Sequence, residues 1–148
     1  MSFGSGSGGV VDVDPAAVWL ALSQQPNAVL VDVRTTAEWS FVGLPDLSSL
    51  GKAPFKVEWQ TFPSMAVNEG FVADLGSALA AQGVDKDAPI YYLCRSGARS
   101  KAAALAMAQA GWSNAYNIAG GFEGGLDPAS HRGSTNGWKA AGLPWNQS

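Results

Sequence analysis

The sequence is poor in cysteine, histidine and charge. Its 148 residues include one Cys, one His, 9 Lys and Arg, and 12 Asp and Glu. A single cysteine excludes an internal disulfide framework and any zinc site built on several thiolates, so we expect no metal and no cofactor. The net charge of −3 argues against nucleic acid or an anionic membrane as the main partner, because both require a basic face. No run approaches the ~20 apolar residues that are needed to cross a bilayer.

The remaining composition favours a folded domain. Hydrophobic residues make up 47% of the chain, and 6 Trp, 6 Phe and 3 Tyr supply large side chains for a core. Residues 1–9 are mostly Gly and Ser without a basic or apolar stretch, which indicates a flexible leader and no secretory signal. We interpret residues 10–148 as one domain, with residues 124–148 as a subgroup-specific tail. The lone thiol and the missing export signal predict a cytoplasmic protein.

Short apolar runs alternate with helical stretches along the chain. Alternation of this kind predicts an α/β fold, with a parallel sheet and helices on both faces. Ligands of such sheets bind beyond the carboxyl ends of the strands, and Cys94 follows one of these ends. We expect strands at 10–13, 28–33, 55–62, 89–93 and 115–118, and helices at 15–25, 36–39, 68–82 (with Asn68 as the cap) and 99–110.

The segment after the fourth of these strands carries the clearest chemistry. It consists of Cys94, Arg95, Ser96, Gly97, Ala98, Arg99 and Ser100. Small residues let the backbone curl, and the N–H groups of the curl and of the following helix attract an anion. The two arginines add bidentate donors for oxyanions, and a cysteine in such surroundings ionises readily. The segment therefore predicts an anion-binding pocket with a reactive thiolate at its base.

The alternative is a purely structural role, in which Cys94 is a small buried hydrophobic residue at the end of an apolar strand. Two arginines close to the thiol argue against it, because burying them for packing alone is costly.

Four parts of the chain carry recognisable motifs, namely Val29–Arg34 with Glu38-Trp39, Ile90–Ser100, Gly111-Trp112 and Ile118–Phe122. Together these motifs resemble the single-domain rhodaneses. The resemblance implies a three-layer fold with a five-stranded, mostly parallel sheet, and sulfur transfer through a persulfide on Cys94. It implies that the rest of the loop binds the substrate, with one arginine facing solvent and the other bracing the loop, in an order that the residues do not reveal. A thiosulfate-like donor and a thiol, cyanide or protein acceptor are implied as partners.

The length of the loop separates relatives within that fold. Cys94 and Arg99 enclose four residues, whereas phosphatases and arsenate reductases that resemble rhodaneses carry one residue more. The shorter loop favours sulfur transfer, and a phosphatase or arsenate reductase is the weaker alternative. A persulfide carrier or protein-interaction module without turnover stays open. At Phe41–Asp46 the chain lacks the Gly-His-Ile and Pro-Gly-Ala sequences that are frequent in the family.

Other polar residues have simpler interpretations. His131 is interpreted as a solvated residue of the tail, because no partner stands at motif spacing. Asp32, Arg34 and Glu38 are interpreted as a strand-end ion-pair cluster that fixes the following turn, in preference to a catalytic group.

The tryptophans are expected to serve packing. Trp138 and Trp145 are predicted anchors of the tail. Contact of Glu58 and Trp59 with an acceptor near the site is a weaker hypothesis.

Overall fold

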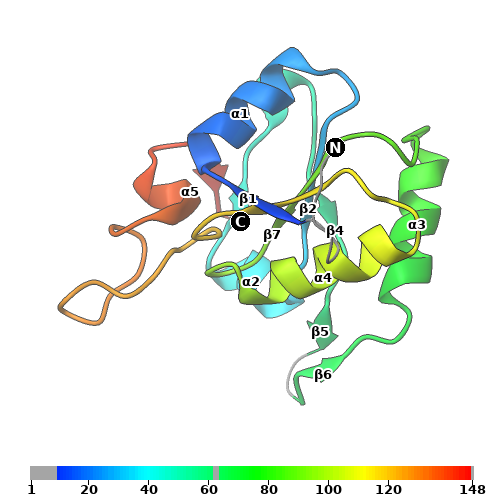
Figure 1. The fold of residues 1–148 in the computed structure, drawn as a ribbon. Helices are drawn as coiled ribbons and strands as arrows, with labels where there is room; N and C mark the ends of the chain where they lie inside the picture. Colours follow the sequence, from blue (N-terminus) through cyan, green and yellow to red (C-terminus); the bar gives the residue numbers. More distant parts are fainter. Residues whose placement is uncertain (1–9, 62–63, 148) are drawn as a thin grey trace.

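A five-stranded, all-parallel sheet forms the centre of the molecule (Figure 1). The computed structural model describes residues 10–61 and 64–147, so the predicted Gly/Ser leader lies outside the described residues. The strand order β1-β8-β7-β2-β4 and the helices on both faces confirm the predicted α/β fold, with every strand pair parallel. The five strands are β1 (Val11–Val13), β2 (Val29–Asp32), β4 (Phe55–Lys56), β7 (Ile90–Leu93) and β8 (Ala115–Ile118).

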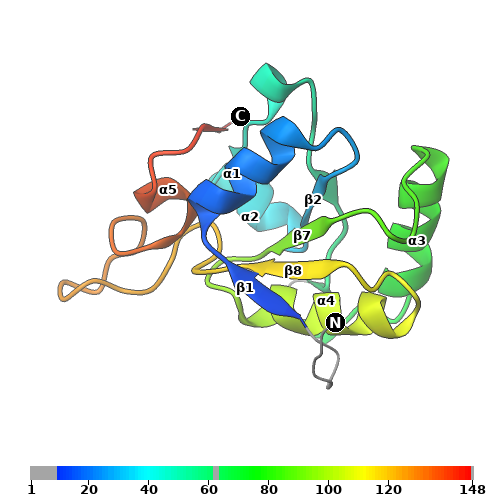
Figure 2. The same ribbon diagram turned by 45° about the horizontal axis from the view of Figure 1, so that its top comes forward.

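Successive residues of the central strands point to opposite faces of the sheet and belong to two separate hydrophobic cores. Leu30 of β2 and Tyr91 of β7 pack on the side of α1 and α5, whereas Val31 and Tyr92 pack on the side of α3 and α4. Figure 2 shows α1 on one side of the strands and α4 on the other. Both faces of these strands are covered, which explains their nearly continuous apolar sequences. The helices are α1 (Pro15–Gln24), α2 (Thr36–Phe41), α3 (Phe71–Ala81), α4 (Ala98–Gln109) and α5 (Gly137–Ala140).

The predicted strand 55–62 is wrong as a single element. Only β4 joins the central sheet, whereas β5 (Gln60–Thr61) pairs antiparallel with β6 (Ala66–Val67) in a separate hairpin. Between them, the Val57 and Trp59 N–H groups donate to carbonyl groups of β2 and of Val33, so the chain follows the sheet edge before leaving it. The Trp59 ring packs edge-on against Phe71 of α3, with 5.1 Å between centroids. Through this contact Trp59 joins the hydrophobic core on the α3 and α4 side of the sheet, and the chain then enters the hairpin.

The predicted helix cap at Asn68 is also wrong. Helix α3 begins at Phe71 with Gly70 as its N-cap, and the Asn68 side chain accepts a hydrogen bond from the Gly70 N–H at 3.0 Å. Its amide also donates to the Glu58 carbonyl at 3.0 Å. Asn68 therefore forms a turn before the helix and ties that turn to the segment that precedes the β5–β6 hairpin.

The predicted tail is anchored to the domain at α5, whereas residues 126–136 form a mostly exposed loop that projects from the body of the molecule (Figure 1). Trp138 of α5 is fully buried, packs edge-on against Trp19 of α1 at 6.0 Å and donates to the Pro144 carbonyl at 2.8 Å. This confirms Trp138 as an anchor. Trp145 is 40% exposed but packs edge-on against the buried Phe122 at 6.1 Å. Near the end of the described chain, β9 (Trp145–Asn146) pairs antiparallel with β3 (Leu44–Pro45), which is followed by a 3-10 helix at Ser48–Leu50.

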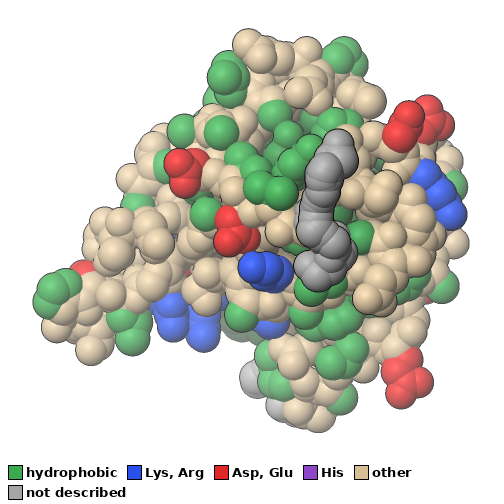
Figure 3. Space-filling view, in the orientation of Figure 1, with side chains coloured by type: hydrophobic (Ala, Val, Ile, Leu, Met, Phe, Trp, Pro, Cys, Tyr) green, Lys and Arg blue, Asp and Glu red, His purple; other side chains and the backbone are tan. Residues whose placement is uncertain are grey.

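The outer surface carries few charges. In Figure 3 acidic and basic side chains are scattered over the face shown, and near its centre one acidic group lies beside a basic one. Among the described residues, no helix has the length and apolar character required to span a membrane.

Candidate functional site

Cys94 lies between the carboxyl end of β7 and the start of α4. Its sulfur accepts hydrogen bonds from the Gly97 N–H at 3.1 Å and from the Ser100 hydroxyl at 3.2 Å. Gly97 is the N-cap of α4 and has φ +116°, a value that disfavours residues with a Cβ atom. The first N–H groups of a helix have no partner inside the helix, so the positive end of α4 faces the sulfur. Only 1% of Cys94 is exposed.

The segment after β8, residues 122–124, binds two carbonyl groups of the loop and holds them away from the Cys94 sulfur. The Cys94 carbonyl accepts from the Phe122 N–H at 2.8 Å, and the Arg95 carbonyl accepts from Glu123 at 2.9 Å and from Gly124 at 3.2 Å. Gly121 has φ +64°, and a Cβ atom there would overlap the Cys94 carbonyl oxygen. Glycine at position 121 is therefore required for the close approach of these two backbones.

The two arginines of the loop differ in their surroundings. Arg99 makes a bidentate ion pair with Glu38 of α2, with Nη1–Oε1 and Nη2–Oε2 distances of 2.8 and 2.9 Å. Arg95 is exposed, and its side chain makes no hydrogen bond or ion pair with the described residues 10–61 and 64–147. The structure therefore assigns what the sequence left open, because Arg99 braces the loop and Arg95 faces solvent.

The Glu38–Arg99 pair has a distinct electrostatic character. Burial alone would raise the pKa of Glu38, but hydrogen bonds from Arg99 and from the Thr35 N–H outweigh it and place the pKa below its ordinary value of 4.5. The hydrogen bond to Glu38 raises the pKa of Arg99, against the effect of burial. Glu38 and Thr35 also form a capping box, which fixes the first turn of α2. The loop is thus braced by a carboxylate that is itself held in place.

Residues 94–100 form one loop and the first turn of α4, and within it Gly97 and Ser100 contact the Cys94 sulfur. The side chains of Arg95, Ser96 and Ala98 are exposed, whereas Ser100 is fully buried against Cys94. The loop therefore has an outer surface that meets solvent and an inner surface that contacts the thiol.

The grouping of Asp32, Arg34 and Glu38 is only partly correct. Asp32 and Arg34 form a fully buried pair, with 2.7 Å between Nη2 and Oδ2. Arg34 also donates to the Gly43 carbonyl at 2.7 Å and lies 4.3 Å from the centre of the Phe122 ring. Glu38 binds Arg99 instead, because α2 turns its first-turn carboxylate toward α4 and away from the end of β2.

The remaining sequence candidates lie outside this arrangement. His131 is exposed, as predicted, and only its backbone is engaged, with its N–H donating to Asp127. Glu58 accepts from the Thr36 N–H at 2.8 Å at the start of α2. Among the described residues, neither Glu58 nor Trp59 hydrogen-bonds to the Cys94–Ser100 loop through its side chain.

Sequence reasoning missed two polar residues behind the thiol. Asn117 of β8 is 4% exposed and contacts Ser100, Gly97 and Asp12 of the neighbouring strand β1. The sequence does contain a signal for Asn117, because it is an amide residue in the otherwise apolar run 115–118. The carboxyl end of this strand lies beside the carboxyl end of β7, where a ligand is expected.

No set of three or more His, Cys, Asp or Glu side chains in the described part of the chain is placed to hold a metal ion. The residues around Cys94 instead supply hydrogen-bond donors and guanidinium groups, which suit an anion.

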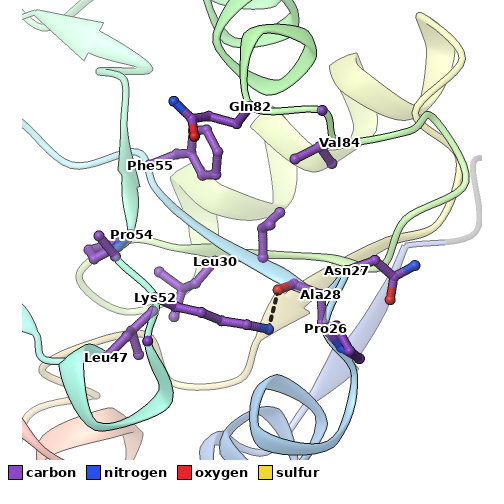
Figure 4. Close-up of a pocket in the computed structure, with 14 residues that line it drawn as sticks. Pro26, Asn27, Ala28, Leu30, Leu47, Lys52, Pro54, Phe55, Gln82 and Val84 are labelled. Atoms are coloured by element: carbon purple, nitrogen blue, oxygen red, sulfur yellow. Dashed lines mark hydrogen bonds between the residues drawn. The ribbon is translucent and has the colours of Figure 1, made fainter.

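A separate pocket of about 580 Å³ lies at the amino ends of the strands (Figure 4). Its lining includes Pro26–Leu30 and Phe55, and none of the loop residues 94–100. Lys52 lies across the pocket, and its ammonium group donates to the carbonyl groups of Gln25 at 2.8 Å and Ala28 at 2.6 Å. These bonds tie the 3-10 turn region to the start of β2, so Lys52 has a structural role there.

Comparison with known proteins supports the same fold. The chain is similar to the uncharacterized protein RP600 of Rickettsia prowazekii, with 40% identity over 119 residues that cover 80% of this chain and 83% of that one. It is 26% identical over 133 residues to the thiosulfate sulfurtransferase GlpE of Actinobacillus succinogenes, which covers 90% of this chain and 87% of GlpE.

Two solved structures extend the likeness. The crystal structure of Rv0390 from M. tuberculosis superposes with a TM-score of 0.82 at 47% identity, over 94% of this chain and 98% of that one. A rhodanese-related protein from Thermoplasma volcanium shares the fold with a TM-score of 0.54 at 16% identity, over 93% and 99% of the two chains. The family described as the STR4 middle domain matches residues 10–148. With its parallel sheet and its cysteine loop between β7 and α4, the chain belongs to this family and is a rhodanese-like protein.

Proposed function

We propose that this protein is a sulfurtransferase that carries a sulfane sulfur as a persulfide on Cys94. The observation that carries the proposal is the place of the Cys94 sulfur, which lies within hydrogen-bond distance of the Gly97 N–H and the Ser100 hydroxyl at the amino end of α4. Hydrogen-bond donors and a helix N-terminus around a cysteine favour its nucleophilic, anionic form. The likeness to a named thiosulfate sulfurtransferase supports the same chemistry.

In the first step the Cys94 thiolate attacks the outer sulfur of thiosulfate or a similar donor. A bond forms between Sγ and that sulfur while the sulfur–sulfur bond of the donor breaks, and its electron pair leaves with sulfite. Arg95, exposed on the outer surface of the loop, binds the anionic donor, and Ser96 and Ala98 line the approach. Because Cys94 is only 1% exposed, a donor with a slim terminal sulfur suits the opening.

In the second step an acceptor removes the outer sulfur of the persulfide. The nucleophile, a thiol or cyanide, bonds to the outer sulfur, and the electron pair of the persulfide bond returns to Cys94 as thiolate. Gly97 N–H and the positive end of α4 stabilise this leaving thiolate, and Arg99 holds the loop in shape through Glu38. The cycle predicts ping-pong kinetics.

The chain offers no internal resolving thiol, since Cys94 is its only cysteine. The persulfide therefore passes to an outside acceptor, a small thiophile or a cysteine of a protein. We place this activity in the cytoplasm, where such acceptors remain reduced.

The test is the intact mass of the protein after incubation with thiosulfate and removal of the donor. The expected result is a gain of one sulfur atom, lost again on addition of cyanide with release of thiocyanate. Cys94→Ser is the matched control and should gain nothing.

Three outcomes distinguish the possible activities. A sulfur adduct with turnover supports the sulfurtransferase, whereas a stable adduct that small acceptors do not discharge indicates a carrier. An unchanged mass at every donor concentration, together with hydrolysis of an aryl phosphate, would overturn the proposal in favour of a phosphatase.

A further inference from the structure

The Ser100 hydroxyl lies among three acceptors but has one proton to donate. It is 3.2 Å from the Cys94 sulfur, 3.2 Å from the Gly97 carbonyl oxygen and closest to Asn117 Oδ1. Ser100 is fully buried, so water does not replace a missing partner there. The hydroxyl therefore serves one acceptor at a time.

The orientation of the Asn117 amide is fixed by groups that only accept. Its Nδ2 faces Asp12 Oδ1 at 3.0 Å and the Gly97 carbonyl oxygen at 3.1 Å. Neither an ionised carboxylate nor a carbonyl donates a hydrogen bond, so the amide nitrogen must point at them. Asn117 Oδ1 then faces Ser100 as a competing acceptor.

The Ser100 proton consequently follows the charge on the sulfur. When Sγ is neutral, as in the thiol or the persulfide, Ser100 donates to Asn117. When Sγ is a thiolate, its charge draws the proton, because hydrogen bonds to charged acceptors are stronger. Asn117 Oδ1 then loses its donor in a buried site, which opposes ionisation.

We propose that Asn117, held by Asp12, is a positioning residue that limits ionisation of Cys94 by competing for the Ser100 proton. Asn117 favours the persulfide over the free thiolate, because its Oδ1 regains the hydrogen bond from Ser100 when Sγ becomes neutral. The consequence for turnover rests on the proposed function, but the competition itself is a property of the resting thiol.

Charged groups on several of the elements that form the site set the electrostatic background for any titration of Cys94. Of these groups, the experiment replaces only Asp12, which is linked to the Cys94 sulfur through Asn117 and Ser100. These groups are Asp12 of β1, Asp32 and Arg34 at the end of β2, Glu38 of α2, and Arg95 and Arg99 of the loop and α4.

The test is the pH dependence of thiolate absorbance in the ultraviolet, with Cys94→Ser as the blank and no sulfur donor present. In Asn117→Leu the hydroxyl is free to serve the sulfur, so the midpoint should fall by about one pH unit, a roughly tenfold larger thiolate fraction at a given pH below it. In Asn117→Asp a charged acceptor holds the proton more strongly, and the midpoint should rise. Opposite shifts from two replacements of one side chain are not expected of general structural damage.

Ser100→Ala supplies the decisive background. The midpoint should rise in Ser100→Ala, and Asn117→Leu should produce no further fall when added to it. An undiminished effect of Asn117→Leu in that background would overturn the proposal, as would shifts of the same sign in Asn117→Leu and Asn117→Asp.

Two more variants protect the test against misfolding. Asp12→Ala changes an exposed residue, frees the amide in part and should lower the midpoint by less than Asn117→Leu; an unchanged midpoint removes Asp12 from the proposal. Asn114→Leu is the matched control, because Asn114 also flanks β8 but donates to the Asp87 carbonyl far from the loop, and its midpoint should equal that of the wild type. Since no donor enters the experiment, its failure leaves the persulfide assay unaffected, and the reverse also holds.

Discussion

Two arginine–carboxylate pairs stand near the cysteine loop, and they differ in depth. The Asp32–Arg34 pair has no exposed side-chain surface, whereas 18% of the Arg99 side chain and 19% of the Glu38 side chain are exposed. The first pair lies within two residues of sequence at the end of β2. The second joins α2 to α4 across 61 residues. Depth and sequence separation thus set the two pairs apart.

The contacts of each pair indicate what it holds. Arg34 joins Asp32 to the Gly43 turn and packs on Phe122, whose N–H binds the Cys94 carbonyl, so it supports the loop from beneath. Arg99 is part of the loop itself and fixes its outer end. A buried pair is costly to break, because one charge stays behind without solvent, whereas a partly exposed pair is screened by water. We infer that the inner pair serves stability and the outer pair serves the shape of the site.

The largest expected effect comes from breaking the inner pair. Arg34→Met leaves the Asp32 carboxylate buried without its partner and should reduce the free energy of unfolding by about 3–5 kcal/mol in urea titrations. Asp32→Leu combined with Arg34→Met removes both charges and should restore most of that loss. A loss below about 1 kcal/mol in Arg34→Met would place this pair in the same class as the outer one.

The two pairs also show which contacts a sequence reveals. Residues 28–33 and 89–93 predict buried strands because an apolar run suits a strand covered on both faces, and β2 and β7 are there. The sequence also indicates the Asp32–Arg34 pair, because both residues stand at the end of the same predicted strand. Glu38 was grouped with them by proximity, yet its partner is 61 residues away.

The parts that sequence reasoning missed depend on packing between distant segments. The alternating pattern at 55–62 is equally compatible with one strand or with an edge followed by a hairpin, and the contact of Trp59 with Phe71 decides between them. The loop residues 94–100 were found through their local composition. Asn117 and Asp12 were not, because their importance arises from the pairing of β1 with β8.

The outer pair should affect transfer more than stability. Arg99→Met should lower kcat of sulfur transfer by about tenfold, since the loop loses a charge-assisted brace, and should change the free energy of unfolding by about 1 kcal/mol or less. The matched control is Arg95→Met, which removes the exposed arginine of the same loop. It should raise KM for an anionic donor and leave kcat nearly unchanged. Equal effects of the two replacements on kcat and KM would contradict the distinction between a bracing and a donor-binding arginine.

The smallest effect concerns the pH dependence that the outer pair contributes. The folded pKa of Glu38 lies below its ordinary value of 4.5, so ionised Glu38 stabilises the fold fully above that pH and loses this contribution as the pH falls through the folded pKa. The difference in unfolding free energy between wild type and Glu38→Gln should therefore be constant near neutral pH and shrink below about pH 4.5. Its size should stay within about 1 kcal/mol, as for other pairs that water reaches.

The same measurement in the Arg99→Met background tests the origin of that contribution. Burial raises the pKa of Glu38, and without Arg99 only the hydrogen bonds from Thr35 oppose it. The acid-dependent difference between Glu38 and Glu38→Gln should then shrink or change sign, because a raised folded pKa makes the ionised form less favourable in the fold than in the unfolded chain. If the difference keeps its full size without Arg99, the capping box of α2 governs Glu38, and the pair is a consequence of the helix cap rather than a brace for the loop.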